Sequence, residues 1–504
     1  MRLLSNFAIL ILSGCLSAFG FAAEIHVPGD HPTIQAAIDS ASPGDTVVVS
    51  PGRYNEKIDF LGKTITLRST NPDNPDVVGA TVLDGSDLLW WCVSFTNGEK
   101  GDSVIEGFTM TGNAQGGGIY CRDSSPMIAG NTFHGNIGAP AILSIGQWAW
   151  LSAPIIYGNT FFQNGTHSVY VIHTDGSALV VRNSFYCNMG PAISTGRNTW
   201  VEENIIMDND DTGILCLNTR SFIVRNTIVG NRAWAWEAGG LCLRNSFGSV
   251  IAGNTISGNK SIDWGGGGTY VSGSATIIGN TIVGNSVLSH GGGGIHGRGH
   301  IALTNNIITG NRAQFGSQLV AEGSSSQFVL RNCLISRGED AIRVSDGGEL
   351  TWGPGNIDGD PLFVDPGHWG AAGNPSYPWD DTFVLGDYHL LPGSPCIDAG
   401  TNNVDNPDTP EVETLPAIDI AGLPRIIDGN LDGVATVDIG AYEYLPGDVN
   451  YDGRVNVLDL ILVRNSLGRD PASSIEARKA DVNADGAVNV QDLIIVRGRL
   501  GKNQ

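Results

Sequence analysis

The sequence is short of positive charge and of cysteine. Its 504 residues include 28 Lys and Arg against 51 Asp and Glu, which gives a formal net charge of −23. So acidic a chain would repel a phosphate backbone, which excludes a nucleic-acid-binding protein. The 8 cysteines are few and scattered for a chain of this length, which excludes a small disulfide scaffold.

Long hydrophobic runs are missing as well, except at the N-terminus. No later segment has the ~18 consecutive apolar residues that a membrane-spanning helix needs. Arg2 precedes an apolar run at residues 7–12, and small residues follow. This pattern predicts a signal peptide over residues 1–23 and a secreted or cell-surface protein. Residues 12–15 also fit a lipobox, so the alternative is a lipid anchor on Cys15.

An internal repeat runs through the middle of the chain. One asparagine recurs nine times at intervals of 21 to 28 residues, and eight of the nine are followed five residues later by a second asparagine. The first column is Asn131, Asn159, Asn183, Asn204, Asn226, Asn254, Asn280, Asn306 and Asn332, and the second is Asn136, Asn164, Asn188, Asn209, Asn231, Asn259, Asn285 and Asn311. The segments between them are short, β-branched and alternating, as in strands. Such a unit predicts a solenoid whose coils stack ~4.8 Å apart, with ladders of turn asparagines.

The segment before the repeats predicts a cover for the open end of this solenoid. Thr33 is a good N-cap for a short helix, and a solenoid has to cover its first coil because exposed edges recruit other chains. The phrases at residues 31–38 and 44–54, together with the Asn-Thr coils, resemble the secreted right-handed parallel β-helix proteins. This superfamily includes pectate lyases, polygalacturonases and pectin methylesterases. The resemblance implies a mainly β fold, a right-handed parallel β-helix over residues 24–355, and a monomer.

The composition changes toward the C-terminus. Residues 356–445 contain sixteen Asp or Glu and one basic residue, Arg425. This acidic stretch resembles the segment that closes many secreted bacterial β-helix proteins, which implies a C-terminal cap rather than a separate catalytic domain. Within it Asp428, Asn430 and Asp432 place oxygen ligands at alternate positions before a glycine, as in half of a calcium loop. These residues predict either a further calcium ion or a solvated acidic loop.

The last segment, residues 447–504, contains a duplicated calcium-binding loop. Each copy has oxygen-bearing side chains at loop positions 1, 3, 5, 9 and 12 and a glycine at position 6, and position 7 supplies a backbone carbonyl. The predicted ligands are Asp448, Asn450, Asp452, Arg454, Asn456 and Asp459 in the first loop, and Asp481, Asn483, Asp485, Ala487, Asn489 and Asp492 in the second. An apolar helical phrase follows each loop, but no full helix precedes the first, so these are not complete EF-hands.

A calcium loop followed by one helix, duplicated at the C-terminus of a secreted chain, resembles a type I dockerin. The resemblance implies two calcium ions and a cohesin-type scaffold protein as partner, because family members fix carbohydrate-active enzymes to scaffolds or surfaces. Many dockerins have Ser or Thr at loop positions 10 and 11, where this chain has Val457, Leu458, Val490 and Gln491. Arg464 and Arg497, both at position 17, remain contact candidates. The alternative is a calcium-stabilised anchor with another partner.

Four glycine-rich strands are predicted to align on one face of the solenoid. The residues expected to point inward are Ile119, Leu241, Thr269 and Ile295. Alternation along a strand then places two rows of residues outward, first Tyr120, Cys242, Tyr270 and His296, and then Arg122, Arg244, Ser272 and Arg298. The loops before the glycines are predicted to rim the same surface with Trp234, Trp236, Glu237, Asp263 and Trp264.

These residue types suit polysaccharide chemistry. Aromatic rings stack on sugar faces, Arg pairs with uronate carboxylates, and an acid beside a base can hydrolyse a glycosidic bond or abstract the proton in a lyase reaction. The candidate catalytic residues are Glu237, Asp263, Arg244, Arg298 and His296, and the candidate substrate-binding residues are Trp234, Trp236, Trp264 and Tyr270. The alternative is that these side chains are ordinary surface residues and that His296 satisfies a turn.

Two further patterns bear on the chemistry. Adjacent Asp210 and Asp211 resemble the paired aspartates of polygalacturonases, but the remaining motifs of that family are not at matching places. Cys216 and Cys242 are 26 residues apart in the sequence and are predicted to lie one coil apart, where they would either form a disulfide or stack.

The sequence as a whole supports two functional hypotheses. The first is a secreted protein that binds a polysaccharide on this face, cleaves it as a lyase or a glycoside hydrolase, and is attached through its dockerin-like module. The second is a non-catalytic surface, adhesion or structural protein whose solenoid serves as a platform. A close acid–base arrangement beside Trp264 and Arg298 favours the enzyme, whereas widely spaced polar residues favour the platform.

Overall fold

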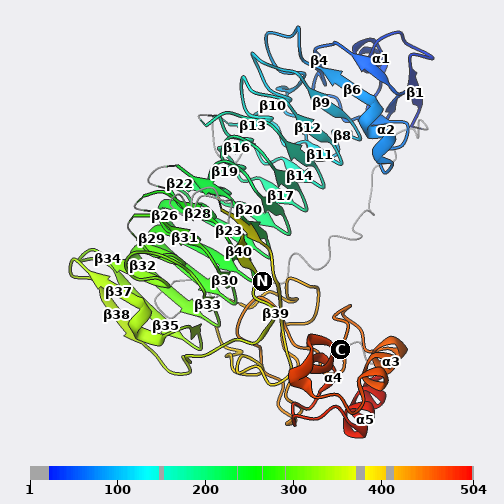
Figure 1. Cartoon of the computed structure of the whole chain (residues 1–504). Helices are drawn as coiled ribbons and strands as arrows, with labels where there is room; N and C mark the ends of the chain where they lie inside the picture. Colours follow the sequence, from blue (N-terminus) through cyan, green and yellow to red (C-terminus); the bar gives the residue numbers. More distant parts are fainter. Residues whose placement is uncertain are drawn as a thin grey trace, which may run out of the picture.

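The computed structural model describes residues 22–501, except for residues 147–151, 168, 235–236, 264, 290, 371–380 and 405–413. The predicted signal peptide, including Cys15, lies outside the described residues apart from its last two positions. The chain forms a long parallel solenoid, and a small helical domain lies beside its last coils (Figure 1). No helix in the described part of the chain is long and apolar enough to cross a membrane.

A short helix covers the first coil, as the sequence predicts. Helix α1 spans Ile34–Ser40, and the Thr33 hydroxyl accepts a hydrogen bond from the Ala36 N–H at 3.2 Å. The apolar side of α1 is fully buried in the solenoid core. A second short helix, α2 (Pro75–Ala80), is capped by the Asn74 side chain.

The coils contribute strands to three long parallel sheets. Sheet 1 consists of β4 (Ile58–Asp59), β7 (Val93–Phe95), β10 (Ile119–Arg122), β13 (Ile142–Ile145), β16 (Ile172–Thr174), β19 (Ile193–Thr195), β22 (Ile214–Leu217), β26 (Leu241–Ala252), β29 (Thr269–Ile278), β32 (Ile295–Thr304), β34 (Leu319–Glu322) and β37 (Ile342–Ser345). Sheet 2 consists of β1 (Glu24–Val27), β2 (Thr46–Val49), β5 (Thr66–Ser69), β8 (Val104–Glu106), β11 (Met127–Ala129), β14 (Ile155–Tyr157), β17 (Leu179–Val181), β20 (Thr199–Glu202), β23 (Ser221–Val224), the second halves of β26, β29 and β32, β35 (Gln327–Arg331) and β38 (Glu349–Trp352).

Sheet 3 has one short strand per coil. It consists of β3 (Gly52–Tyr54), β6 (Thr81–Asp84), β9 (Thr109–Thr111), β12 (Thr132–His134), β15 (Thr160–Phe162), β18 (Ser184–Tyr186), β21 (Ile205–Met207), β24 (Thr227–Val229), β27 (Thr255–Ser257), β30 (Thr281–Val283), β33 (Ile307–Thr309) and β36 (Leu334–Ile335). A narrow strip between sheets 3 and 1 is formed by β25 (Arg232–Ala233), β28 (Lys260–Ser261) and β31 (Ser286–Val287).

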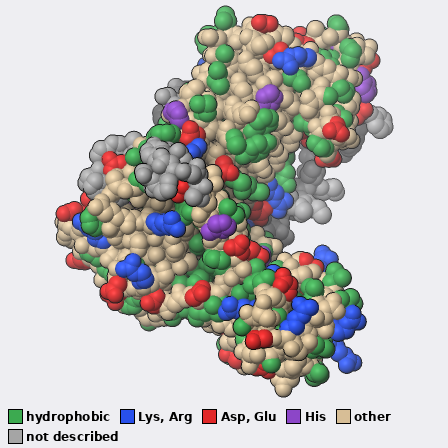
Figure 2. Space-filling view, viewed as in Figure 1, with side chains coloured by type: hydrophobic (Ala, Val, Ile, Leu, Met, Phe, Trp, Pro, Cys, Tyr) green, Lys and Arg blue, Asp and Glu red, His purple; other side chains and the backbone are tan. Residues whose placement is uncertain are grey.

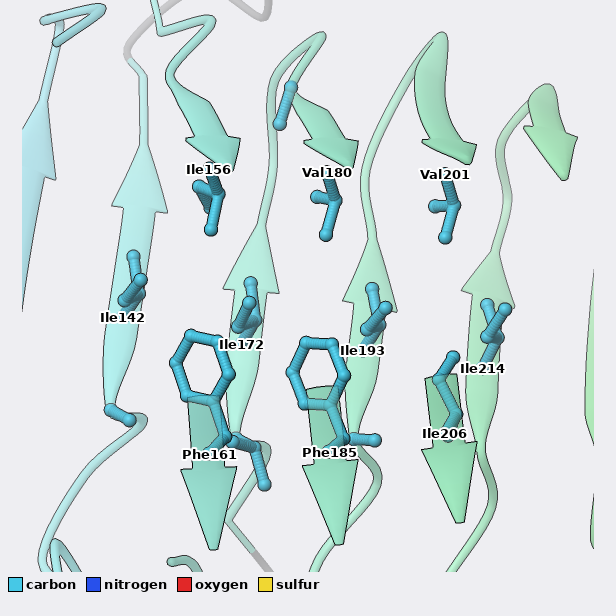
Figure 3. Packing of buried hydrophobic residues seen from close by; sticks show 14 of the residues in the cluster. Ile142, Ile156, Phe161, Ile172, Val180, Phe185, Ile193, Val201, Ile206 and Ile214 are labelled. Carbon is cyan, nitrogen blue, oxygen red and sulfur yellow. The ribbon is translucent and has the colours of Figure 1, made fainter. Parts of the chain in front are cut away.

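The core consists of like residues stacked from coil to coil. Ile142, Ile172 and Ile193 pair in register on neighbouring strands of sheet 1 (Figure 3). On sheet 3 the rings of Phe161 and Phe185 are stacked, with centroids 4.7 Å apart and 4° between their planes. These side chains are fully buried, and each such burial contributes about 1.5–3 kcal/mol to stability.

Two ladders of asparagine side chains run along the turns, as the sequence predicts. The Nδ2 of each asparagine donates to the Oδ1 of the next, as from Asn131 to Asn159 at 3.1 Å and from Asn209 to Asn231 at 2.8 Å. The same Nδ2 groups also donate to backbone carbonyls of the preceding coil, as from Asn131 to Ile105 at 3.1 Å. The ladders therefore satisfy buried backbone groups that the turns would otherwise leave unpaired.

The prediction for the end of the first ladder is wrong by one residue. Cys333 rather than Asn332 follows Asn306, whose N–H lies 3.5 Å from the Cys333 Sγ. The Asn332 backbone is left-handed, with φ of 47°, and its Nδ2 donates to the Ala399 carbonyl at 3.1 Å. The ladder passes through Cys333 to Asn356, whose Oδ1 accepts from the Cys333 N–H at 3.0 Å and whose Nδ2 donates to the Leu330 carbonyl at 3.0 Å.

Cys216 and Cys242 form no disulfide and do not stack, so both alternatives from the sequence are wrong. Both thiols are free. Cys242 pairs in register with Leu215, and Cys216 pairs with Leu243. Because side chains alternate along a strand, Cys216 points into the core and Cys242 points to the outer face. The coil is 27 residues long at this point, one more than the spacing of the two cysteines.

The acidic segment after the last coil turns back along sheet 3. Its strands pair as β39 (Phe363–Asp365) with β42 (Asp387–Leu390) and as β40 (His368–Gly370) with β41 (Thr382–Val384). Phe363 and Tyr388 pack on the outer side of Leu334. The one cation of the segment, Arg425, is buried in an ion pair with Glu443, 3.0 Å away. Its guanidinium also donates to the Gly440 carbonyl at 3.0 Å, so this side chain lies in the interior of the segment.

The C-terminal domain is packed against the acidic segment. Helices α3 (Val457–Ser466) and α5 (Val490–Arg499) follow the two predicted calcium loops, as expected, and α4 (Ile475–Ala480), which the sequence did not predict, lies between them. One hydrophobic core joins Ile427 and Leu445 of the acidic segment to the helices. The dockerin-like domain therefore lies directly against the rest of the chain (Figure 1).

Replacing Asn231 by alanine removes one member of the second ladder. Asn231 Nδ2 donates to Ile206 O and Asn259 Oδ1, and its Oδ1 accepts from Asn209. Each buried group left unpaired costs about 1–3 kcal/mol, so we expect Asn231→Ala to lower the free energy of unfolding by about 3 kcal/mol in denaturant titrations followed by circular dichroism. Asn465→Ala, at an exposed position of α3, is the control; an equal loss in both variants would contradict the prediction.

Candidate functional site

The glycine-rich strands of sheet 1 align as the sequence predicts. Cys242, Tyr270 and His296 pair in register on β26, β29 and β32, and the row continues to Val320 and Arg343. Two residues further along the strands lies a second row, with Arg244, Ser272, Arg298 and Glu322. The residues that alternate with these rows are in the core, so both rows point outward.

Four side chains of these rows form a cluster, which we call the His296 cluster. His296 Nε2 lies 2.7 Å from Glu322 Oε2, and Arg298 Nη2 donates to Glu322 Oε1 at 2.7 Å. The Tyr270 ring stands edge-on to the imidazole, with centroids 5.4 Å apart. The hydrogen bond from His296 lowers the pKa of Glu322 to about 2, and Arg298 acts in the same direction against burial. Glu322 is therefore ionised at neutral pH and holds the His296 and Arg298 side chains in place.

The members of the His296 cluster differ in their access to solvent. The His296 side chain is 2% exposed, whereas the Arg298 side chain is 47% exposed. Among the described residues, no group forms a hydrogen bond with His296 Nδ1. Arg298 can therefore contact a ligand on this surface. His296 is buried and can influence such a ligand only through its contact with Glu322.

A second cluster lies on earlier coils, two to five from that of His296, and is rich in carboxylates. It consists of Asp211, Glu237, Tyr170 and Arg244. Thr212 Oγ1 donates to Glu237 Oε2 at 3.1 Å, and Arg244 Nη1 lies 3.8 Å from Glu237 Oε1. Burial raises the pKa of Asp211 to about 7; the Thr212 N–H opposes this shift, and the charges of Glu237 and of the adjacent aspartate add to it. Asp211 is therefore protonated about half of the time at neutral pH.

A small hydrophobic patch joins the two clusters. Leu215, Ala238 and Cys242 are buried on the outer side of sheet 1. Tyr170 of the carboxylate cluster and Tyr270 of the His296 cluster both pack against this patch. Burial raises the pKa of both tyrosines, so both are neutral donors at physiological pH. The surface therefore presents aromatic and apolar groups flanked by charges.

The other predicted site residues belong to neither cluster, and two of them are not described. The Trp234 ring is 44% exposed and lies edge-on to His167, with centroids 5.7 Å apart. Asp263 Oδ1 accepts a hydrogen bond from the Ser289 hydroxyl at 2.6 Å. Two predicted residues lie outside the described part of the chain, Trp236 and Trp264.

The surface cavities do not by themselves identify the candidate site. A cavity of about 130 Å³ adjoins His296 and Glu322, and a hollow of about 490 Å³ beside it shares Phe315 and Arg343. A larger hollow of about 780 Å³ is lined by side chains of sheet 3, including Phe162. We place the candidate site on the outer side of sheet 1 because a carboxyl group with a pKa of about 7 lies there among other ionisable side chains.

Three members of the two clusters were not predicted as site residues from the sequence: Glu322, Tyr170 and Asp211. Glu322 ends β34, whose coil lacks the run of glycines that marks the neighbouring strands. Counting forward from Arg298 to the equivalent position of the next coil would have found it. Tyr170 precedes β16, which carries no glycine signature either, and the burial that sets the pKa of Asp211 is a property of the fold.

The two loops of the C-terminal domain hold their oxygen ligands by the same contacts. Asp448 Oδ2 accepts from the Gly453 N–H at 2.8 Å, and the buried Asp459 accepts from the N–H groups of Asn450 at 3.3 Å and Asn456 at 2.8 Å. The second loop repeats these contacts with Asp481, Gly486, Asn483, Asn489 and Asp492. Burial, followed by the charges of neighbouring carboxylates, raises the pKa of Asp448 to about 6. Converging oxygen ligands with this charge fit Ca²⁺.

Comparison with family models decides the family. A model described as "Right handed beta helix region" matches residues 79–233 and 239–353, more than half of the chain. The chain therefore belongs to the right-handed β-helix family. A second model, described as "Dockerin type I domain", matches residues 446–501 of the β-helix protein. Both results confirm the predicted fold class and the predicted dockerin module.

The β-helix protein is also similar to solved structures, although no curated protein matches it significantly. It is 14% identical to the pectate lyase Pel9A over 85% of this chain and 98% of that chain, with a TM-score of 0.34. It is 15% identical to the PL6 family alginate lyase AlyGC over 68% of this chain and 54% of that chain, with a TM-score of 0.39. It is 12% identical to PfbA, a surface adhesin of Streptococcus pneumoniae, over 68% of this chain and 93% of that chain, with a TM-score of 0.36.

The His296 cluster predicts a pH-dependent contribution to stability. The pKa of Glu322 is about 2 in the folded β-helix protein, against 4.5 for a glutamate in the unfolded chain. The ionised carboxylate therefore stabilises the fold above about pH 4.5, and this contribution is lost as the pH falls through about 2. We expect Glu322→Gln to lower the free energy of unfolding by about 2 kcal/mol at pH 7, with a difference that shrinks toward pH 2.

The matched control is Glu349→Gln, at an exposed position of β38. Both variants are compared with the wild-type chain in denaturant titrations between pH 3 and pH 7. If Glu322→Gln lowered the free energy of unfolding by the same amount at pH 3 and at pH 7, the low pKa assigned to Glu322 would be contradicted.

Proposed function

We propose that the β-helix protein is a secreted carbohydrate-active enzyme that hydrolyses a polysaccharide on the outer side of sheet 1. Its dockerin domain attaches it to a cohesin-bearing scaffold or surface. The observation that carries the proposal is the pKa of Asp211, which is raised to about 7 beside Glu237. Most glycoside hydrolases use a pair of carboxyl groups, of which one keeps its proton near neutral pH and acts as the general acid.

In this proposal Asp211 is the acid and Glu237 is the carboxylate. Asp211 gives its proton to the glycosidic oxygen as the bond from that oxygen to the anomeric carbon breaks. Glu237 assists the attack of water at that carbon and takes the proton that the water loses. Arg244 and the Thr212 hydroxyl hold the Glu237 carboxylate in position.

The surrounding surface suits a sugar chain. The rings of Tyr270 and Trp234 offer faces and edges for sugar contacts, and the exposed guanidinium of Arg298 can pair with a uronate carboxylate. His296 is a positioning residue in this proposal, because it acts through Glu322. Asp263, from the coil after Glu237, belongs to the rim of the surface.

The second candidate function is a non-catalytic platform that binds a glycan. One observation favours it, because Glu322 is fully paired with His296 and Arg298 and its pKa is about 2. A carboxylate paired in this way stays ionised near neutral pH and therefore does not act as a proton donor. The two candidates therefore differ in whether Asp211 and Glu237 control product release.

Product release from a panel of polysaccharides tests the enzyme. Reducing-end assays detect hydrolysis, and ultraviolet absorbance detects the unsaturated products of a lyase. We expect Asp211→Asn and Glu237→Gln to lower kcat/KM by at least about 100-fold. We also expect wild-type kcat to fall as the pH rises through about 7, because Asp211 then loses the proton that it donates.

The control is Asp102→Asn, at an exposed turn in the N-terminal half of the solenoid, which should keep wild-type activity. Glycan binding by every variant is measured in parallel by calorimetry. Unsaturated products would show that the enzyme is a lyase rather than a hydrolase. Glycan binding without product release on any polysaccharide of the panel would support the non-catalytic platform.

The dockerin domain extends the proposal to two calcium ions and a protein partner. Its loop positions 10 and 11 are exposed, with Val457 and Leu458 at the start of α3 and Val490 at the start of α5. Arg464 and Arg497 are exposed near the ends of these helices. Lys and Arg side chains gather on the outer side of the domain (Figure 2). An apolar patch rimmed by cations is typical of a protein-binding surface, which supports a cohesin as partner.

Removal of calcium tests this part of the proposal. Because a domain of this size depends on its ions, we expect a chelator to abolish the helical signal of the domain and to weaken binding to a type I cohesin by at least about 100-fold. Circular dichroism and calorimetric titration measure the two effects, and the strand signal of the β-helix should persist. Asp448→Asn with Asp481→Asn should reproduce the effect, and unchanged cohesin binding would contradict it.

A further inference from the structure

The hollow of about 780 Å³ on the outer side of sheet 3 contains no residue of the two clusters on sheet 1. Four neighbouring strands, β9, β12, β15 and β18, contribute lining residues, so the hollow runs along the solenoid axis for about three coil spacings, or ~14 Å. Helix α2 forms one end with Pro75 and Val78, and the Val78 carbonyl accepts from the Thr109 hydroxyl at 2.9 Å. We call this hollow the sheet 3 groove.

A row of hydroxyl groups runs along the sheet 3 groove. Thr109, Thr132 and Thr160 pair in register on β9, β12 and β15. The residues that follow them, such as Phe133 and Phe161, are in the core, so the threonines point outward. Thr132 and Thr160 are half-buried, and no described residue forms a hydrogen bond with either hydroxyl. These two hydroxyls are therefore available to a ligand.

Stacked aromatic rings form one side of the groove. His134, Phe162 and Tyr186 pair in register on β12, β15 and β18, two residues after the hydroxyl row. The centroids of His134 and Phe162 are 5.0 Å apart and those of Phe162 and Tyr186 are 5.4 Å apart, with 16° and 4° between the planes. On the other side of the hydroxyl row, Tyr157 lines the groove from the end of β14. Both tyrosines are more than a third exposed, so aromatic carbon is open to a ligand on both sides.

The chain itself covers the same face on later coils. Phe363 and Tyr388 of the acidic segment pack on the outer side of Leu334, and the outward-pointing Ser257 of β27 is fully buried. In the groove, by contrast, Tyr186 is 39% exposed. The sheet 3 groove is therefore a part of this face that the described acidic segment leaves open.

The charge of the groove disfavours anionic ligands. None of the described residues that line it is a Lys or an Arg, whereas Asp73 and Glu106 are both present. Burial lowers the pKa of His134, and the charge of Arg53 adds to this shift, so the imidazole is neutral at pH 7. Burial raises the pKa of Glu106, against the charge of Arg68. With no cation to pair with a carboxylate or sulfate, the groove favours an uncharged ligand.

The groove suits a sugar chain better than a peptide. It crosses the strands of sheet 3, whose backbone groups are hydrogen-bonded to the coils before and after them, so an extended peptide would find no backbone partners. Hydroxyl groups and aromatic carbon are what the hydroxyls and C–H groups of a sugar need. The coils also repeat every ~4.8 Å, which is close to the length of one residue in an extended β-linked sugar chain.

We propose that the sheet 3 groove is a second glycan-binding site and that it takes an uncharged, extended, β-linked oligosaccharide. The hydroxyls of Thr132 and Thr160 bond to hydroxyls of successive sugar residues, and the rings of Phe162 and Tyr186 contact their C–H groups. The exposed Arg298 on sheet 1 suits a uronate instead, so the two surfaces select different chains. Binding in the groove does not depend on whether sheet 1 is catalytic.

Calorimetric titration of the full-length chain tests the groove. Glu237→Gln is the background, so that the proposed hydrolysis does not consume the probe. The probes are cellohexaose, xylohexaose and mannohexaose, three uncharged β-1,4-linked hexasaccharides, and hexagalacturonate as the anionic counterpart. We expect at least one uncharged probe to bind, and Tyr186→Ala and Thr160→Val each to weaken its affinity by at least about 10-fold, because each removes one of the proposed contacts.

The matched controls lie outside the groove. Phe247→Ala changes an aromatic ring that is 67% exposed, and Thr351→Val changes an exposed threonine of β38. Both should keep the affinity for the uncharged probe, as should Arg298→Ala on sheet 1. Circular dichroism establishes that each variant is folded, and Thr160→Val covers the case in which Tyr186→Ala is not.

Four results would overturn the proposal. They are the absence of binding by all three uncharged probes, equal affinity in the wild-type residues and both groove variants, loss of binding in Arg298→Ala alone, and tighter binding of hexagalacturonate that the groove variants abolish. Self-association that Tyr186→Ala abolishes, measured by sedimentation in the absence of glycan binding, would assign the groove to a second copy of the chain. None of these results depends on product release, so failure of the proposed hydrolysis leaves the test intact.

Discussion

Stacking of one coil on the next is the constraint on which the rest of the structure depends. Each turn asparagine bonds to the coil before it and to the coil after it, as Asn131 does with Ile105 and Asn159. Since side chains alternate along a strand, a slip of one residue would exchange core and surface over the whole coil. The outer rows of sheet 1 are aligned only because the interior fixes this register. The surface chemistry is therefore a consequence of how the core packs.

The acidic residues of the molecule differ in what neutralises them. Glu322 is bonded to His296 and to the Arg298 guanidinium, and its pKa falls to about 2. Asp211 is buried, and its pKa rises to about 7, so a proton neutralises it. Asp448 is buried among other carboxylates, and its pKa rises to about 6. Cations nearby thus lower the pKa of a carboxyl group in this molecule, whereas burial alone or among other carboxylates raises it.

The parts of the structure that repeat could be predicted from the sequence. The asparagine ladders, the helix cap at Thr33, the alignment of Tyr270 with His296 and the dockerin loops all follow from local spacing. Contacts without a local pattern could not be predicted. Asp398 accepts a hydrogen bond from the Asn430 N–H, 32 residues further along the chain, and the pKa of Asp211 depends on burial by neighbouring coils. The cysteine prediction failed because one coil is a residue longer than the spacing suggested.

The contact between the dockerin domain and the acidic segment has a consequence for how the molecule meets its surroundings. Tyr451, in the first calcium loop, donates its hydroxyl to the Leu390 carbonyl at 3.0 Å, and the two parts share one hydrophobic core. In the described part of the chain, packed contacts therefore hold the dockerin domain against the segment that closes the solenoid. If the molecule were held by this domain, the long axis of the solenoid would keep one orientation relative to the support.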